Sequence, residues 1–297
     1  MKKSKGEIAF TIINTIVILL LCFITIYPYI NQLAISFNDG GDTIKGGITF
    51  FPRKFTLDNF KTVFRNPSVG SAAVVSVSIV VLFTLLSLAV TYGAAYGLSK
   101  RRLPYKHFLN LFMLLPGYIS VGVIPTYILY RYLGLINNYW VYIIPGLFSF
   151  YNMIIIRSYI QELPESIEES AMIDGANEFQ IMCKIIFPMS LPVVATVVLW
   201  LMVGKWNDWT TTLYYVIDKE LYTLQYLMMR LIKESEAVQQ LAMESAMYKT
   251  GQETTATITS DSVKAATLMI TTLPIIMVYP FLQKYFIKGV TLGAVKG

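Results

Sequence analysis

The sequence has few of the residues that build chemical sites in proteins. Its 297 residues include one histidine and two cysteines, and only 14% of them are charged. Cys22 lies in a hydrophobic run and Cys183 in a more polar segment, so we expect no structural disulfide between them. His107 stands beside Lys106, and no set of metal-binding residues accompanies it in the sequence. We therefore predict no metal site and no disulfide framework.

The sequence also lacks the short motifs that bind nucleotides or position catalytic nucleophiles. No G-x-x-x-x-G-K-[ST], G-x-G-x-x-G, H-E-x-x-H, G-x-S-x-G or C-x-x-C pattern occurs. We expect no catalytic residue and no cofactor in this chain, and any ATP hydrolysis must belong to another polypeptide. The hydrophobic runs are almost free of ionisable residues, which argues against an intramembrane enzyme and against a proton-coupled transporter.

What the sequence does contain is long hydrophobic runs. Hydrophobic residues make up 55% of the chain, and a helix needs about 20 apolar residues to cross the hydrocarbon core of a bilayer. The runs predict an all-α integral membrane protein with six spans. These lie at about 9–30, 71–98, 107–130, 139–160, 188–206 and 264–283.

Basic residues predict the orientation of the spans. Lys2, Lys3 and Lys5 precede a first run that is too long for a signal peptide and lacks an A-x-A-like cleavage site, so we expect it to stay in the membrane. Further lysines and arginines cluster at residues 100–106, between spans two and three. The positive-inside rule then places both termini and the 157–188 loop in the cytoplasm. This topology, with basic residues facing anionic lipid headgroups, explains the basic sequence pI of about 9.1, which is no evidence for nucleic acid.

The loops suggest a division of the chain. We expect residues 1–70 to form the first span and an external loop, which glycines and aromatic residues should order into a cap. Residues 71–297 should form a five-span core with a cytoplasmic loop at about 157–188 and an external loop at about 207–262. Within the latter, residues 221–232 predict a helix lying on the membrane. Prolines in spans three to six predict kinks, at positions 116, 125, 145, 188, 192, 274 and 280.

The segment 164–176, Pro-Glu-Ser-Ile-Glu-Glu-Ser-Ala-Met-Ile-Asp-Gly-Ala, is the most informative part of the chain. Pro164 suits a helix start, and the acidic residues that follow suit the positive end of a helix dipole. Asp174-Gly175 should end this short helix, because glycine adopts left-handed backbone angles at little cost. A second helix can then start near Asn177. We therefore predict a helix-turn-helix on the cytoplasmic side.

With Pro188 and Pro192 downstream, this string resembles the "EAA" loop of permease subunits of binding-protein-dependent ABC transporters. Ser170 stands where that family usually has its first alanine, and serine is small enough to keep the same helix contact. Two further segments, Trp206-Asn-Asp-Trp209 and Leu135-Ile-Asn-Asn-Tyr-Trp140, resemble elements of the carbohydrate-uptake branch of that family. The tail from Lys284 to Gly297 resembles that of subunits related to the second maltose-transporter permease, most closely those of the oligo- and polysaccharide group.

The resemblance implies a type I ABC importer fold and a bacterial inner-membrane permease that imports oligosaccharides or polysaccharide fragments. The implied partners are a homologous second permease, two ATP-binding subunits that carry Mg-ATP, and an extracellular solute-binding protein. Glu169 should pair with an arginine of the ATPase. The residues that the resemblance assigns to ATPase docking are Glu168, Glu169, Ser170, Ala171, Ile173, Asp174, Gly175 and Ala176, with a C-terminal contact through Val295, Lys296 and Gly297.

Alternatives remain open from the sequence. A permease for peptides or amino acids would share the loop, and a membrane scaffold without transport activity would place no ATPase on it. The tail can also be a frayed terminus. Trp206, Asn207, Asp208 and Trp209 are candidate solute-path residues because aromatic rings beside hydrogen-bonding groups suit sugars. Tryptophans are equally common as interfacial anchors.

Overall fold

A computed structural model describes residues 4–100, 103–119, 121–248 and 259–294. The described residues are mostly helical, and their one strand-like feature is an isolated bridge between Asn38 and Phe55. The chain divides into two compact units, residues 1–69 with 228–273 and residues 70–227 with 274–297. The sequence predicted a division at residue 70. It did not predict that residues 228–273 would group with the N-terminal part of the chain.

The first unit begins with α1 (Lys5–Ser36), a long apolar helix. Ser4 caps it, since its hydroxyl accepts the Glu7 N–H while the Glu7 carboxylate accepts the Ser4 N–H. None of its candidate membrane-spanning window is buried within this chain. The unit also holds α2 (Gly40–Thr43), α3 (Asp58–Phe64), most of α13 (Leu224–Tyr248) and the first part of α14 (Ser260–Ala294).

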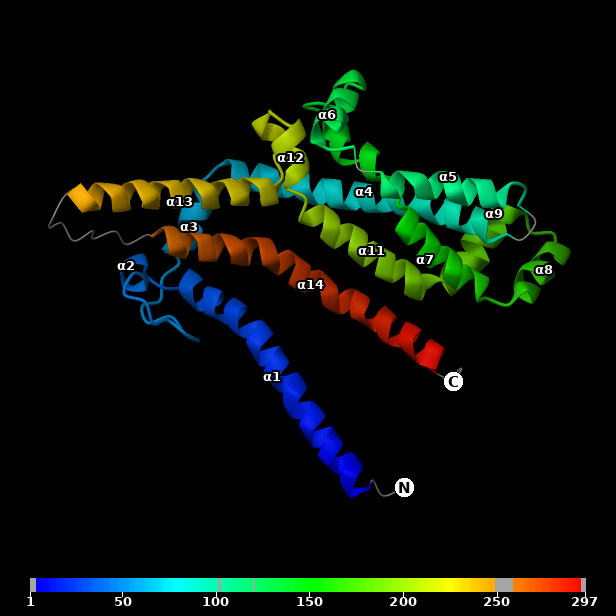
Figure 1. The fold of residues 1–297 in the computed structure, drawn as a ribbon, viewed down its shortest axis with the longest axis horizontal. Helices are drawn as coiled ribbons and strands as arrows, with labels where there is room; N and C mark the ends of the chain where they lie inside the picture. Colours follow the sequence, from blue (N-terminus) through cyan, green and yellow to red (C-terminus); the bar gives the residue numbers. More distant parts are fainter. Residues whose placement is uncertain (1–3, 101–102, 120, 249–258, 295–297) are drawn as a thin grey trace. The chain divides into compact units, whose positions relative to one another are not determined.

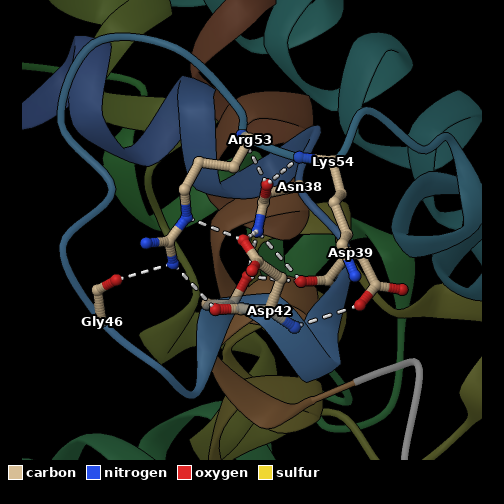
Figure 2. A network of polar contacts seen from close by, with 7 residues as sticks. Asn38, Asp39, Asp42, Gly46, Arg53 and Lys54 are labelled. Atoms are coloured by element: carbon tan, nitrogen blue, oxygen red, sulfur yellow. Dashed lines mark hydrogen bonds and ion pairs between the residues drawn. The ribbon is translucent and has the colours of Figure 1, made fainter.

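A polar network orders the loop between α1 and α3 (Figure 2). The buried Asn38 accepts the N–H groups of Arg53 and Lys54, each at 2.8 Å, and donates to Asp42 Oδ2 at 3.1 Å. Arg53 Nε donates to the same Asp42 oxygen at 2.9 Å, and its terminal nitrogen donates to the Gly46 carbonyl at 2.7 Å. These hydrogen bonds connect the two ends of the loop, and its predicted role as a cap over the membrane stays a prediction.

The second unit contains α4 (Ser68–Ser99, from Gly70 on), α5 (Lys106–Tyr118), α6 (Val123–Tyr132) and α7 (Phe150–Gln161), with two short 3₁₀ turns, η1 (Tyr139–Tyr142) and η2 (Ile144–Gly146), before α7. The remaining elements are α8 (Glu165–Ile173), α9 (Glu178–Ile181), the π-helix η3 (Met182–Ile186), α10 (Phe187–Met189), α11 (Leu191–Trp206), α12 (Thr210–Tyr215) and η4 (Lys219–Leu221). Fully buried apolar side chains form its core, among them Ile79, Tyr142, Ile156, Ile186 and Val197.

The described helices provide three unbroken candidate spans, within α1, α4 and α14, and three bent pairs. Each pair is bent by more than 40° at a short break, so the predicted six spans are present if each pair counts as one. In two of the pairs every residue is described. The sharper of these two bends, 84°, lies between Glu178–Met189 and Leu191–Trp206. Prolines 188 and 192 flank it, and a proline cannot donate the backbone hydrogen bond that a straight helix requires.

Candidate functional site

Helix α8 and the turn after it form the site predicted from residues 164–176. Gly175 adopts a left-handed backbone with φ +84°. Its N–H donates to the Met172 carbonyl at 3.0 Å, and the Ala176 N–H donates to the Ala171 carbonyl at 3.0 Å. These two bonds form a Schellman motif, which satisfies carbonyls at the helix end. The predicted break at Asp174-Gly175 is confirmed.

The next helix starts where the sequence predicts. Asn177 caps α9, because its side-chain oxygen accepts the Gln180 N–H at 2.9 Å while the Gln180 side chain accepts the Asn177 N–H at 3.0 Å. Figure 1 shows α8 and α9 together at one end of the second unit, near the ends of α4, α5 and α7. The helix-turn-helix is therefore held by caps at both sides of its turn.

The outward face of this turn is both acidic and apolar. Glu169, Ser170 and Asp174 are exposed. The Ile173 side chain is 86% exposed and that of Met172 is 46% exposed, whereas Ala171 is buried against the core. Exposed large apolar side chains beside carboxylates, at the end of a short rigid helix, are suited to contact another protein.

The inward face is fixed by Lys100, one residue beyond the end of α4. Its ammonium forms ion pairs with Glu168 of α8 and with Glu178 of α9, the latter at 3.1 Å. The hydroxyl of Tyr96 donates to Glu178 at 2.7 Å, and Lys100 Nζ lies 4.2 Å from the centre of the Tyr96 ring. Partial burial disfavours the charge of Lys100, yet the hydrogen bonds to Glu168, Tyr96 and Glu178 prevail and raise its pKa.

The structure thus separates the predicted docking residues into two groups. Glu168 and Ala171 face their own chain, where one is paired and the other packed. Glu169, Ser170, Ile173, Asp174 and Gly175 are exposed, and Ala176 is half-buried. The predicted tail contact, Val295, Lys296 and Gly297, lies outside the described residues.

The second candidate cluster, at the end of α11, uses its polar groups internally. Asp208 Oδ2 pairs with Lys205 Nζ at 3.0 Å and accepts the Thr211 hydroxyl at 2.7 Å. Its other oxygen accepts the Thr210 hydroxyl and the Thr211 N–H, each at 3.1 Å. Burial opposes the charge of Asp208, but Lys205 and the bonds from Thr211 outweigh it and lower the pKa of the carboxyl. Asp208 therefore fixes the start of α12.

The neighbours of Asp208 have different surroundings. Asn207 is exposed, and its side-chain amide donates to the Val203 carbonyl at 3.0 Å. Trp206 lines a cavity of about 160 Å³ with apolar walls, together with Val77, Val80, Val81, Met202, Val203, Pro274, Ile275 and Val278. Such walls suit an apolar group better than the hydroxyl groups of a sugar. The structure does not test the solute-path prediction, but it gives Asp208 and Trp206 contacts within the chain.

Sequence reasoning did not identify Lys100 or Lys205 as site residues. In the sequence Lys100 stands out only as part of a basic cluster, because its partners Glu168 and Glu178 are 68 and 78 residues away. Lys205 could have been found, since it precedes Asp208 by three residues on a predicted helix end, a spacing that brings two side chains together.

Comparison with known proteins identifies the family. Residues 86–292 match the family of the binding-protein-dependent transport system inner membrane component. The chain belongs to this family. It is therefore a multi-pass membrane protein and a transport component rather than a catalyst, as the "EAA" resemblance predicts.

The relatives span the same length as this chain. It is 36% identical to Protein LplC of Bacillus subtilis (strain 168), covering 100% of this chain and 98% of that protein. It is 33% identical to the polygalacturonan/rhamnogalacturonan transport system permease protein YtcP of the same strain, covering 94% and 96%. A solved bacterial ABC transporter involved in the import of the acidic polysaccharide alginate has a chain that matches with a TM-score of 0.84, 24% identity and coverage of 96% and 99%. The fold is that of type I ABC importers.

Proposed function

We propose that this chain is the permease subunit of an ATP-driven importer of oligosaccharides or polysaccharide fragments. The observation that carries the proposal is the capped α8–α9 turn, with Glu169 and Ile173 exposed on a rigid outward face, in a chain of the binding-protein-dependent permease family. The substrate class follows the names of relatives that match more than nine-tenths of the chain, including permeases for polygalacturonan/rhamnogalacturonan and for arabinooligosaccharides.

The exposed face of α8 is the docking surface for an ATPase subunit in this proposal. Glu169 supplies a carboxylate for an arginine of the ATPase, and Ile173 supplies an apolar contact beside it. ATP binding on the partner closes the ATPase pair and moves α8 as a lever. Two permease subunits then alternate between inward-facing and outward-facing states around the solute path.

The remaining parts of the assembly belong to the same proposal. A homologous second permease completes the solute path, an extracellular binding protein delivers the sugar, and both termini lie in the cytoplasm. The tail through Lys296 adds a second ATPase contact. Asn207 is the member of the Trp206–Trp209 cluster with the most accessible polar side chain, so it is the first candidate for a sugar contact.

Reconstitution of the complete complex tests the proposal. Proteoliposomes that contain this chain, its partner permease, the ATPase and the binding protein are loaded with ATP and supplied with labelled trigalacturonate, arabinotriose, maltotriose or a tripeptide. We expect ATP-dependent uptake of at least one oligosaccharide and no uptake of the peptide. Uptake of the peptide alone would replace the substrate class, and failure to recover any ATPase subunit with this chain would refute the permease assignment.

A further inference from the structure

An ionic cluster at one end of the second unit joins the end of α4 to α8 and α9, which lie far from it in the sequence. Lys100 follows α4, Glu168 lies in the middle of α8, and Glu178 opens α9. The side chains of Lys100 and Glu168 are only 23% and 20% exposed. Low exposure and several shared hydrogen bonds make such a cluster stiffer than an ordinary surface ion pair.

The end of α4 is itself firmly held. The Lys106 ammonium of α5 donates to the carbonyls of Lys100 at 3.1 Å and Ser99 at 3.4 Å, and the Gln161 amide of α7 donates to the Ser99 carbonyl at 3.4 Å. Lysine at a helix C-terminus also interacts favourably with the helix dipole. Lys100 therefore projects from a fixed point toward α8.

A second contact joins α4 to the region beyond α9. The Tyr92 hydroxyl lies 2.8 Å from the Ser190 hydroxyl in a buried pair, and the Tyr92 ring contacts the Phe187 ring edge-on at 5.1 Å. Ser190 lies at the 84° bend between α10 and α11. The cytoplasmic part of α4 is thus joined both to the docking helix and to the bend of the following span.

We propose that Lys100 is a positioning residue that ties α8 to α4, so that force applied to the exposed face of α8 moves α4 and the α10–α11 bend with it. This inference rests on the proposed function, because it assigns Lys100 a part in coupling ATP hydrolysis to transport. Glu169 makes the contact with the ATPase, and Lys100 determines whether that contact displaces the spanning helices.

Substitution of Lys100 in the complete reconstituted complex tests the tie. Lys100→Met removes the cation and keeps much of the side chain's length. We expect assembly and basal ATP hydrolysis to persist while the amount of sugar transported per ATP falls by about tenfold, within the usual range of coupling between two sites. The transported sugar is the oligosaccharide of the panel above that the wild type takes up best. Amide hydrogen exchange across residues 165–173 should become faster.

Two controls accompany this variant. Lys100→Arg keeps the charge and should stay close to the wild type in both measurements. Lys184→Met makes the same change at an exposed lysine of η3, for which the described part of the chain contains no ion pair, and should also match the wild type. A role for Lys100 in folding alone would lower the yield of the complex without changing the sugar transported per ATP in the complex that forms.

The outcomes are distinguishable from failure of the proposed function. If wild-type complex transports no oligosaccharide, the proposed substrate class fails, while the exchange measurement still tests the tie. If Lys100→Met prevents assembly, Glu168→Gln removes the partner carboxylate instead and should accelerate exchange and lower coupling. Wild-type exchange and wild-type coupling in the assembled variant would overturn the proposal.

Discussion

Two lysine–carboxylate clusters in the second unit differ in how far apart their residues are in the sequence and in what they leave exposed. At the α8–α9 turn, Lys100 pairs with acidic residues 68 and 78 positions away and leaves Glu169 and Ile173 exposed on the other face. At the end of α11, Lys205 pairs with Asp208 three positions away, their side chains are 12% and 17% exposed, and both Asp208 oxygens are used by the same short segment.

The comparison distinguishes the proposed docking surface, which leaves polar groups exposed, from a cluster whose polar groups bond to one another within the chain. The first group positions one face of a helix from behind, so the opposite face keeps unpaired hydrogen-bonding capacity for another molecule. In the second group, the carboxylate oxygens of Asp208 bond to Thr210 and Thr211 at the start of α12. A carboxylate that already accepts four bonds has little left for a sugar hydroxyl.

The largest effect is expected at Glu169. Glu169→Lys places a like charge where the ATPase is proposed to present an arginine, and loss of one partner from a buried ion pair typically costs about 3–5 kcal/mol. We expect uptake to be abolished and ATPase recovery with this chain to fall, while the variant remains in the membrane. The matched control is Glu162→Lys, which reverses another exposed acidic residue of the same loop and should keep most of the activity. Normal uptake by Glu169→Lys would remove the docking assignment.

Asp208→Leu should act on stability rather than on transport chemistry. It leaves Lys205 largely buried without its carboxylate, at a cost of about 3 kcal/mol. A lower melting temperature of the purified protein should accompany any loss of uptake, and the additional change Lys205→Met should restore part of the stability. Asn207→Leu removes a single hydrogen bond, so its melting temperature should stay closer to that of the wild type even if uptake falls. If Asp208→Leu melts like the wild type but does not transport, the residue belongs to the solute path instead.

Gly175→Val should weaken the docking turn without touching its exposed face. A β-branched residue at φ +84° is strained, by about 1–3 kcal/mol. We expect reduced stimulation of ATP hydrolysis by the loaded binding protein. Gly175→Asn is the matched variant, because asparagine tolerates left-handed angles, and it should retain most of the stimulation. Equal activity of the valine and asparagine variants would show that the turn geometry is unimportant.

The smallest expected effect is on the stability of the protein at acidic pH. The pKa of Asp208 is lowered from its ordinary value of 3.8, so the stability that it contributes is present above that value and is lost as pH falls through the lower folded pKa. Melting temperature measured from pH 7 down to pH 3 should therefore fall less steeply for the double variant Lys205→Met/Asp208→Leu than for the wild type. Parallel curves would show that this pair contributes nothing to the acid limit.

The helix ends and the turn between α8 and α9 could be predicted from the sequence. The ion pairs that hold α8 against α4 could not. Pro164, Gly175 and Asn177 are capping and turn residues whose preferences act over a few positions, so the predicted helix ends agree with α8 and α9. The pairing of Lys100 with Glu168 depends on packing between distant segments and has no local signal. Hydrophobic runs predicted the spans for the same local reason, and prolines 188 and 192 predicted a kink where the 84° bend lies.

Cross-linking at Ile173 tests the central claim most directly. A photoreactive phenylalanine analogue replaces Ile173, which is 86% exposed on the proposed docking face, and the complex is irradiated in membranes. Tyr132, at the end of α6 and 88% exposed, is the control position. We expect the probe at Ile173 to capture the ATPase subunit and the probe at Tyr132 not to capture it. Capture from Tyr132 with none from Ile173 would contradict the assignment of α8 as the element that couples this permease to ATP hydrolysis.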